Sequence, residues 1–475
     1  MTRKKTLVSG ISWSAFERFS VQGMQLVIFI CMARMLTPTD YGLVGMLTVF
    51  IVISQLLAEG GMSQAIIRKL DRNQTDCSTA FWANIVFGLL LYGLLFIIAP
   101  WIADFYGEMR LTALLRVLAL AVVFQSSLVI HRSLLTAQLD FRTQAKSTLV
   151  GAILSGATGL TMAYNGYGAW SLVGLQITNQ VTTGIVLWIL SDWRPKMIFS
   201  LASFRKLFNF GAKIIGGKLA ENLYTGLYSL FIGKLFNAYA LGSYTNARQL
   251  GSISSENLTN IVQRASFPLF CAMRHDPELL RESLIKYIRL SAFFIAPLML
   301  GLAAISEPLT TSLLGYQWVY TSRLLRILCP TFIIYPLMMI NFMVFEIYGM
   351  GTEYLRLKIM SLLLGIAAFV VFLPFGLSAV CCGYFAASGL TYLIVAHISG
   401  RKIGVSLMQQ IRVLIPIIAN SMIMGVAMYA FQYIIPDPWT QIILCSIIGV
   451  AIYTILSVAF MTDTCKLLVS TIRRK

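Results

Sequence analysis

Long apolar runs dominate the pattern of hydrophobic and polar positions and recur along the whole chain. A run of about 20 apolar residues lets a helix cross the roughly 30 Å hydrocarbon core of a bilayer. Short turns rich in Gly, Pro and Asn separate several runs, as at residues 37–40 and 165–168. The pattern predicts about fourteen membrane-spanning helices. They lie near residues 11–36, 41–60, 81–99, 112–136, 147–166, 169–190, 210–234, 240–268, 285–306, 318–346, 355–375, 378–398, 411–434 and 440–461.

The composition is that of a membrane protein. Of the 475 residues, 57% are hydrophobic and 12% are charged, whereas soluble domains average about 25% charged residues. The mean hydropathy of +0.77 excludes an ordinary soluble protein. The eight cysteines lack metal-ligand spacing and lie mostly in apolar runs, which argues against a zinc site and a disulfide framework. The sequence therefore predicts an all-α polytopic membrane protein, with no metal site and no cofactor.

The basic residues are arranged in a way that predicts topology. The 37 lysines and arginines outnumber the 19 acids, which gives a formal charge of +18. They gather at every second connection between apolar runs, around residues 3–5, 68–72, 142–146, 194–206, 274–281, 356–358, 401–402 and 473–475, and Arg110 is the main exception in an intervening connection. Lysine and arginine concentrate in cytoplasmic loops of membrane proteins. The alternation places both termini in the cytoplasm and explains the surplus charge with no nucleic acid as a partner.

A weak internal repeat divides the chain into two halves. At an offset of 200 residues, the matched pairs are Arg18 with Lys218, Arg34 with Lys234, and Gly42 with Gly242. Duplicated halves are common in transporters, and this offset aligns the first predicted helix with the seventh. We expect a six-helix N-terminal lobe at residues 1–190, a cytoplasmic linker at 191–208, a pseudo-symmetric six-helix C-terminal lobe at 209–400, and two additional helices with a basic cytoplasmic tail at 401–475.

Polar side chains inside the apolar runs are the candidates for function. A charge at the middle of a membrane costs at least about 2.5–3.5 kcal/mol, so it normally faces a cavity or a partner. Spacings of three and four residues align these side chains along single helical faces. The stripes are Ser14, Arg18, Gln22 and Gln25; Thr48, Gln55 and Glu59; Lys218, Glu221, Asn222, Thr225 and Ser229; and Arg248, Ser252, Ser255, Thr259 and Gln263, with Glu256 and Arg264 close by. We expect a polar cavity between the lobes.

The predicted depth of each cation in the membrane indicates how strong a candidate it is for binding a substrate. Arg18, Lys218 and Arg248 lie about 7 to 10 residues inside their runs, or roughly 10–15 Å from the nearer end, and cannot easily reach water. They are the strongest candidates for binding a substrate, and Lys213 is a candidate entry contact. The polar neighbours included in the candidate site are Gln22, Gln25 and Asn222. The alternative for each charge is pairing within the bundle, or snorkelling to the interface as expected for residues near helix ends.

Three embedded acids, Glu17, Glu221 and Glu256, have two interpretations. They could bind a coupling proton or sodium ion, or they could neutralise the neighbouring cations, which we favour. The isolated histidines, including His131, lie near predicted cytoplasmic boundaries and are interpreted as interfacial. No P-loop, GxSxG or HExxH motif is present, so no catalytic residue and no enzyme activity are predicted.

Several motifs carry a family resemblance. Residues 33–44 read ARMLTPTDYGLV, residues 59–69 read EGGMSQAIIRK, and residues 166–173 read GYGAWSLV. Shorter matches lie at residues 13–14, 80–82, 99–100, 139–142, 232–234 and 241–244. Together they resemble the Wzx-type polysaccharide exporters, lipid-linked oligosaccharide flippases of the multidrug/oligosaccharidyl-lipid/polysaccharide superfamily, in the branch that includes the colanic-acid exporter. One departure is Gly60-Gly61 after Glu59, where the family usually has an aspartate before a single glycine.

The resemblance implies fourteen helices in two lobes, alternating access and a bacterial inner membrane. It implies undecaprenyl pyrophosphate carrying an oligosaccharide repeat unit as substrate, for O-antigen, capsule or exopolysaccharide synthesis. Membrane lipids, a polysaccharide polymerase and other biosynthesis proteins are the implied partners. In this setting Arg18, Lys218 and Arg248 would bind the anionic pyrophosphate, because a cation acts strongly on a phosphate in a low-dielectric cavity.

Two other functions stay open. A drug or cation antiporter of the same superfamily would share the fold, although it would more naturally present acids and aromatic residues to a cationic drug. A membrane glycosyltransferase or polymerase would usually need a large outward loop, and no predicted outward loop exceeds about fifteen residues. The basic balance of the polar stripes favours the flippase.

Overall fold

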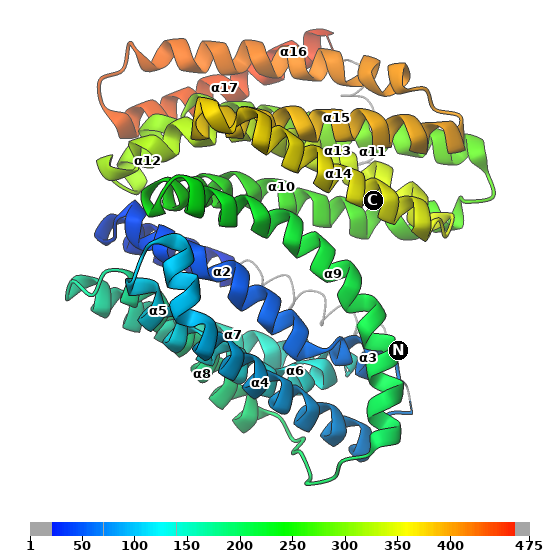
Figure 1. Ribbon diagram of the computed structural model, residues 1–475. Helices are drawn as coiled ribbons and strands as arrows, with labels where there is room; N and C mark the ends of the chain where they lie inside the picture. Colours follow the sequence, from blue (N-terminus) through cyan, green and yellow to red (C-terminus); the bar gives the residue numbers. More distant parts are fainter. Residues whose placement is uncertain (1–20, 70, 139, 461–475) are drawn as a thin grey trace. The chain divides into compact units, whose positions relative to one another are not determined.

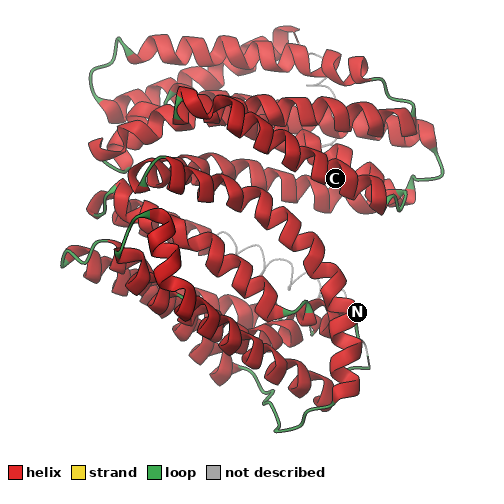
Figure 2. Cartoon of the chain, viewed as in Figure 1, coloured by secondary structure: helices red, strands yellow, loops and turns green. Residues whose placement is uncertain are grey.

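The protein is all-helical in the part that the computed structural model describes, which is residues 21–69, 71–138 and 140–460 (Figures 1 and 2). No strand occurs in these ranges. Ten of the described helices are long and apolar enough to cross a membrane. The chain is therefore a multi-pass membrane protein, as the apolar runs predict.

The chain forms two compact units, Met1–Gly242 and Ser243–Lys475. In the first unit a helical segment at Val21–Met35 is followed by α2 (Pro38–Glu59), α3 (Met62–Arg68), α4 (Gln74–Tyr106), α5 (Arg110–Leu118), α6 (Leu120–Ala137), α7 (Phe141–Tyr164), α8 (Ala169–Leu190) and α9 (Leu201–Leu235). α10 (Ala238–Ala272) begins in the first unit. The second unit continues with α11 (Pro277–Ala304), α12 (Ser306–Leu313), η1 (Tyr316–Trp318), α13 (Val319–Ile347), α14 (Gly351–Phe372), η2 (Leu373–Phe375), α15 (Leu377–Ile403), α16 (Leu407–Gln432) and α17 (Pro438–Phe460).

The predicted apolar runs are mostly helical over their described residues, although the run at 112–136 is divided between α5 and α6 at Ala119. The segment Val21–Met35 and the helices α7, α9 and α10 are not among the ten candidate spans, because polar residues interrupt the long ones and only part of the first is described. The count of fourteen spans, the lobes and their boundaries therefore stay predictions. α9 begins at Leu201, inside the expected linker of residues 191–208.

Side-chain caps explain where several helices begin. Thr37 and Asp40 form a reciprocal capping box before α2, with Pro38 at the first helical position. The Thr37 backbone N–H donates to Asp40 Oδ2 at 2.9 Å. Asn73 and Asp76 do the same for α4, where the Asp76 backbone N–H donates to Asn73 Oδ1 at 2.8 Å. Such boxes satisfy backbone donors that the first turn leaves unpaired. The turn predicted at residues 37–40 is therefore shorter in the structure, where residues 36–37 form the connection and residues 38–40 are already the first turn of α2.

The repeated glycines, Gly42 and Gly242, lie at a reciprocal helix crossing in the first unit. A Cβ added to Gly42 would lie 1.7 Å from the carbonyl oxygen of Ala238, and one added to Gly242 would lie 1.7 Å from that of Pro38. The start of α2 thus contacts the start of α10 backbone to backbone. Because position 42 contacts 238 while 38 contacts 242, the contact has the self-complementary form of a two-fold interface.

The double glycine after α2 is required by a second close approach. Gly60 and Gly61 both have positive φ, 59° and 64°, which side chains other than glycine rarely adopt. A Cβ on Gly61 would also lie 2.4 Å from the carbonyl oxygen of Gly211 in α9. The departure from the family pattern noted in the sequence is therefore the point where the α2–α3 turn packs on α9.

A buried polar network joins three helices of the second unit. Asn341 of α13 donates through Nδ2 to Gln410 Oε1 of α16 at 3.2 Å, and Ser399 of α15 donates through Oγ to Asn341 Oδ1 at 2.6 Å. All three side chains are fully buried. Buried amides and hydroxyls are costly unless paired, so this network fixes the first turn of α16 against α13 and α15.

Candidate functional site

Half of the candidate residues from the sequence lie outside what the structure describes. Arg18 and Glu17 precede the described residues, and although α9 contains Lys213, Lys218 and Glu221, their side chains are outside the described part. Their proposed roles stay predictions. The remaining candidates are Gln22, Gln25, Asn222, Arg248 and Glu256.

In the first unit the described candidates lie on helices that pack together. Gln22 is half-buried and Gln25 is exposed, both on Val21–Met35. Asn222 on α9 is half-buried. One turn later, a Cβ on Gly226 would lie 3.1 Å from Val49 of α2, so α2 and α9 lie side by side here. The predicted polar stripes of α2 and α9 therefore belong to neighbouring helices of one unit.

In the second unit the stripe predicted on α10 splits into two parts. Ser255 and Thr259 are fully buried and do not line open space: Ser255 Oγ donates to the carbonyl oxygen of Phe332 in α13 at 2.7 Å, and Thr259 Oγ1 donates to the carbonyl oxygen of Ser255 at 2.7 Å. Their assignment to a polar cavity was wrong. Buried hydroxyl groups can donate hydrogen bonds to backbone carbonyl oxygens where helices pack, and need no water-filled space. Arg248 is half-buried, and Glu256 is exposed.

The chain between α8 and α9 is fastened to the beginning of α4. Trp82 Nε1 donates to the Lys196 carbonyl oxygen at 2.9 Å, and the Lys196 backbone N–H donates to Ser78 Oγ at 3.0 Å. Trp193 Nε1 donates to Gln74 Oε1 at 2.7 Å. These bonds give residues 191–200 a defined path although they form no helix.

His131 lies beneath this connection in an aromatic cluster. Its ring centroid is 4.9 Å from that of Trp188 and 5.0 Å from that of Trp193, and Phe81 packs at its edge. The side chain is fully buried. The sequence places His131 near a cytoplasmic boundary, and the structure adds that the connection covers the histidine, so its side chain is not exposed to water.

A salt bridge marks the same end of α4. Lys69 Nζ donates to Asp76 Oδ2 at 2.5 Å, and this hydrogen bond raises the pKa of Lys69. Asp76 is 2% exposed and also caps α4. Lys69 was expected only as a basic loop residue that sets topology, whereas here it also holds the α3–α4 turn.

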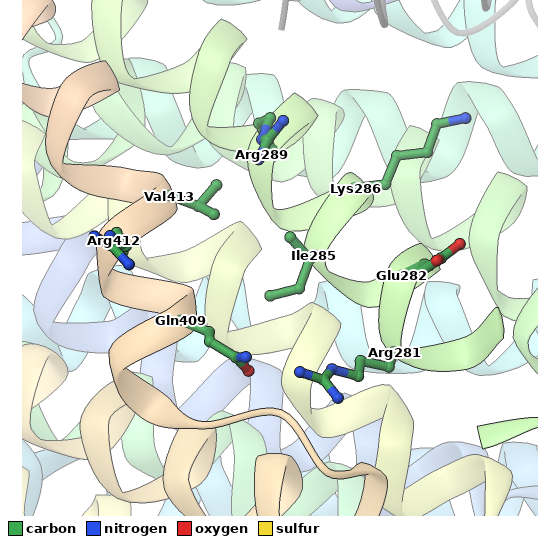
Figure 3. Close-up of a pocket in the computed structure, with 8 residues that line it drawn as sticks. All are labelled: Arg281, Glu282, Ile285, Lys286, Arg289, Gln409, Arg412 and Val413. Carbon is green, nitrogen blue, oxygen red and sulfur yellow. The ribbon is translucent and has the colours of Figure 1, made fainter. Parts of the chain in front are cut away.

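A basic pocket lies between α11 and α16 in the second unit (Figure 3). Its volume is about 390 Å³. Four basic side chains line it together with one acid, Glu282: Arg281, Lys286, Arg289 and Arg412. Figure 3 shows Arg281 and Ile285 extending from α11 toward α16, while Glu282 extends the other way. We call these lining residues the basic pocket.

The basic pocket was missed from the sequence for a definite reason. Arg281 was counted as a loop residue that sets topology, and no role was assigned to Lys286, Arg289 and Arg412, which lie at the beginnings of two predicted apolar runs. The available signal was the spacing of 281, 286 and 289, which places three cations within about two and a half turns of one helix. That signal does not reveal that Arg412, more than one hundred residues later, faces the same space.

Comparison with known sequences gives consistent matches. The sequence model of a family described as "Polysaccharide biosynthesis protein" matches residues 31–323. The teichuronic acid biosynthesis protein TuaB of Bacillus subtilis is 27% identical over 336 residues, which cover 70% of each chain. The succinoglycan biosynthesis transport protein ExoT of Rhizobium meliloti is 26% identical over 70% of this chain and 69% of its own. For the lipopolysaccharide biosynthesis protein WzxC of Escherichia coli the identity is 25%, over 69% of this chain and 67% of its own. The sequence resemblance is confirmed.

Solved structures share the fold. The lipid II flippase MurJ, in an inward closed conformation, matches with a TM-score of 0.74 at 16% identity and covers 95% of this chain and 99% of its own. An inward-facing multidrug resistance transporter of the MATE family, from the MOP superfamily, matches with a TM-score of 0.62 at 16% identity, over 82% of this chain and 98% of its own. At these identities the likeness concerns the fold alone.

Proposed function

Because the chain belongs to the polysaccharide biosynthesis protein family, whose sequence model matches more than half of its length, we propose that it is a flippase for lipid-linked oligosaccharides. It moves undecaprenyl-pyrophosphate-linked repeat units across the bacterial inner membrane by alternating access, with both termini in the cytoplasm. The carrying observation is that relatives aligned over about 70% of the chain are named for the biosynthesis or transport of teichuronic acid, succinoglycan or lipopolysaccharide. It works beside a polymerase and other biosynthesis proteins and catalyses no reaction.

The pyrophosphate is the part of the substrate with the highest free-energy cost of crossing the membrane, because it carries charge into hydrocarbon. In the proposed mechanism Arg18, Lys218 and Arg248 bind it, and Lys213 makes the first contact. Arg248 supports this role by its half-buried position on a long helix. An arginine can hold two phosphate oxygens at once, whereas a lysine acts as a point charge.

The function is tested by deleting the gene and measuring the lipid-linked repeat unit. We expect surface polysaccharide to disappear and the lipid-linked unit to accumulate, protected from a glycosidase added outside intact cells. Complementation should reverse both effects. Unchanged polysaccharide would refute the flippase proposal, and increased resistance to cationic drugs on overexpression would favour the antiporter.

The proposed binding residues are tested by substitutions that either remove or keep the positive charge. Arg248→Ala should reduce export at least about tenfold at normal protein levels, while Arg248→Lys should keep part of it. The matched control is Arg264→Ala, because Arg264 is exposed on the same helix. Equal effects of both alanine variants would contradict a binding role for Arg248.

The same logic applies to the cations outside the described part. Arg18→Ala and Lys218→Ala should abolish most export, and the swaps Arg18→Lys and Lys218→Arg should retain some. If Arg18 only neutralises Glu221 or Glu256, removing both partners should restore export, which a double-mutant cycle measures. Such a recovery would show that Arg18 forms a structural ion pair and does not bind the substrate. It would also show that the acid removed is not needed to bind a coupling ion.

A further inference from the structure

The basic pocket between α11 and α16 carries cations that have no ion-pair partner among the described residues. The side chains of Arg281, Lys286, Arg289 and Arg412 make no ion pair and no hydrogen bond with any other described residue. Their one acidic neighbour in the pocket, Glu282, pairs with none of them. Like charges in one pocket repel each other unless an anion joins them. The pocket therefore favours an anionic ligand.

Its position along the helices indicates where this anion comes from. Arg289 is the last charged residue of α11, and the helix continues without charge to Ala304. Arg412 is the last charged residue of α16, which is uncharged from residue 413 to Gln432. Both helices begin near the pocket and carry no charged residue beyond it. The two arginines thus lie where polar and apolar surface meet, the level of the phosphates of membrane lipids.

The lining combines charge with an apolar wall. Ile285 and Val413 lie between the cations, and Ile285 extends between the two helices in Figure 3. A volume of about 390 Å³ falls within the range of small-molecule sites, roughly 300–1,000 Å³. A phosphate on the arginines would leave its glycerol part against Ile285 and Val413.

We propose that the basic pocket binds the headgroup of an anionic phospholipid of the surrounding membrane and so ties α16 to α11. Four basic side chains against one acid select a net negative headgroup, such as phosphatidylglycerol, over zwitterionic phosphatidylethanolamine. The residues that line the pocket are different from those proposed to bind the transported lipid. The proposal stands whether or not the flippase assignment is correct.

The test measures phospholipid binding to the purified full-length protein in detergent by native mass spectrometry and by thermal stabilisation. Phosphatidylglycerol should bind the wild-type protein and raise its melting temperature, and phosphatidylethanolamine should do so only weakly. The double variant Arg289→Gln, Arg412→Gln should bind phosphatidylglycerol roughly 20- to 30-fold more weakly, since each cation contributes about a fivefold increase in affinity.

Two further variants keep the result interpretable. Arg289→Lys with Arg412→Lys retains the charge and should bind phosphatidylglycerol within a few fold of wild type, which also shows that the pocket tolerates substitution. The matched control is Arg401→Gln with Lys402→Gln, which removes the same charge from two exposed residues outside the pocket. It should leave binding unchanged.

Two outcomes would overturn the proposal. One is an equal loss of phosphatidylglycerol binding in the pocket variant and the control, which would mean diffuse attraction to a basic surface. The other is a pocket that binds polyprenyl pyrophosphate but not phosphatidylglycerol, which would make it part of the transport route. Because the assay measures no transport, failure of the flippase assignment would leave its result unaffected.

Discussion

Replacing Gly42 by alanine should strongly destabilise the first unit, because the added Cβ would clash with the backbone of α10. The new Cβ would lie 1.7 Å from the carbonyl oxygen of Ala238, 2.4 Å from the carbonyl carbon and 2.8 Å from Cα. Ordinary carbon contacts need about 3.5 Å, so the two backbones must separate by roughly 1.5 Å or more. Overpacking in a core costs about 1–3 kcal/mol, and the obstacle here is backbone that cannot rotate away. We expect at least about 3 kcal/mol.

The measurement is thermal unfolding of the purified protein in one detergent. A loss of about 3 kcal/mol corresponds to a melting temperature lower by roughly 6–12 °C for a domain of 150–250 residues. The matched control is Gly93→Ala in α4, where an added Cβ meets nothing within 4 Å. That variant should be neutral or slightly more stable, because alanine favours a helix over glycine by about 1 kcal/mol.

The reciprocal contact of Gly42 and Gly242 also predicts how the two alanine substitutions combine. Gly242→Ala meets Pro38 at the same 1.7 Å, so one separation of the two helices relieves both clashes. The double variant Gly42→Ala, Gly242→Ala should therefore lose clearly less than the sum of the single losses. Additive losses would refute the shared crossing, and a Gly42→Ala protein as stable as Gly93→Ala would refute the close approach itself.

Two further predictions concern the connections. Ser78→Ala with Trp82→Phe should speed trypsin cleavage after Lys196 roughly 20- to 30-fold, because the two hydrogen bonds that hold its backbone are each worth about 1 kcal/mol; an unchanged rate would show that the connection opens independently of α4. In a cysteine-free background, a membrane-impermeant thiol reagent should label Tyr167→Cys but not Asp71→Cys in intact cells, because basic loops face the cytoplasm. Labelling of Asp71→Cys from outside would reverse the topology.

The helices could be predicted from the sequence because the apolar runs that form them are local. Capping residues such as Thr37 and Asp40 also act within one turn, so the helix break predicted near residues 37–40 coincides with the beginning of α2. The direction of a polar stripe is not local. Ser255 and Thr259 have the spacing of a cavity-facing stripe, yet the neighbouring α13 decides that they are buried against it.

The 200-residue repeat shows that the sequence can identify matched positions but not the contacts that they make. Pairing Gly42 with Gly242 identified the two positions, but spacing could not reveal that they meet through Ala238 and Pro38. His131 is a comparable case, since its burial depends on Trp188 and Trp193 from elsewhere in the chain. Contacts between distant segments decide both, and no periodicity encodes them.

The basic residues also show that topology and binding are not alternative explanations for one charge. Lys69 belongs to a basic loop cluster and also holds Asp76, and Arg281 belongs to another and also lines the basic pocket. Removing such a residue changes the loop charge and the local contact together, so the loss alone identifies neither role. An exchange of arginine for lysine keeps the charge that sets topology and alters only the geometry of binding. Charge-conserving variants are therefore the ones that can separate the two roles in this protein.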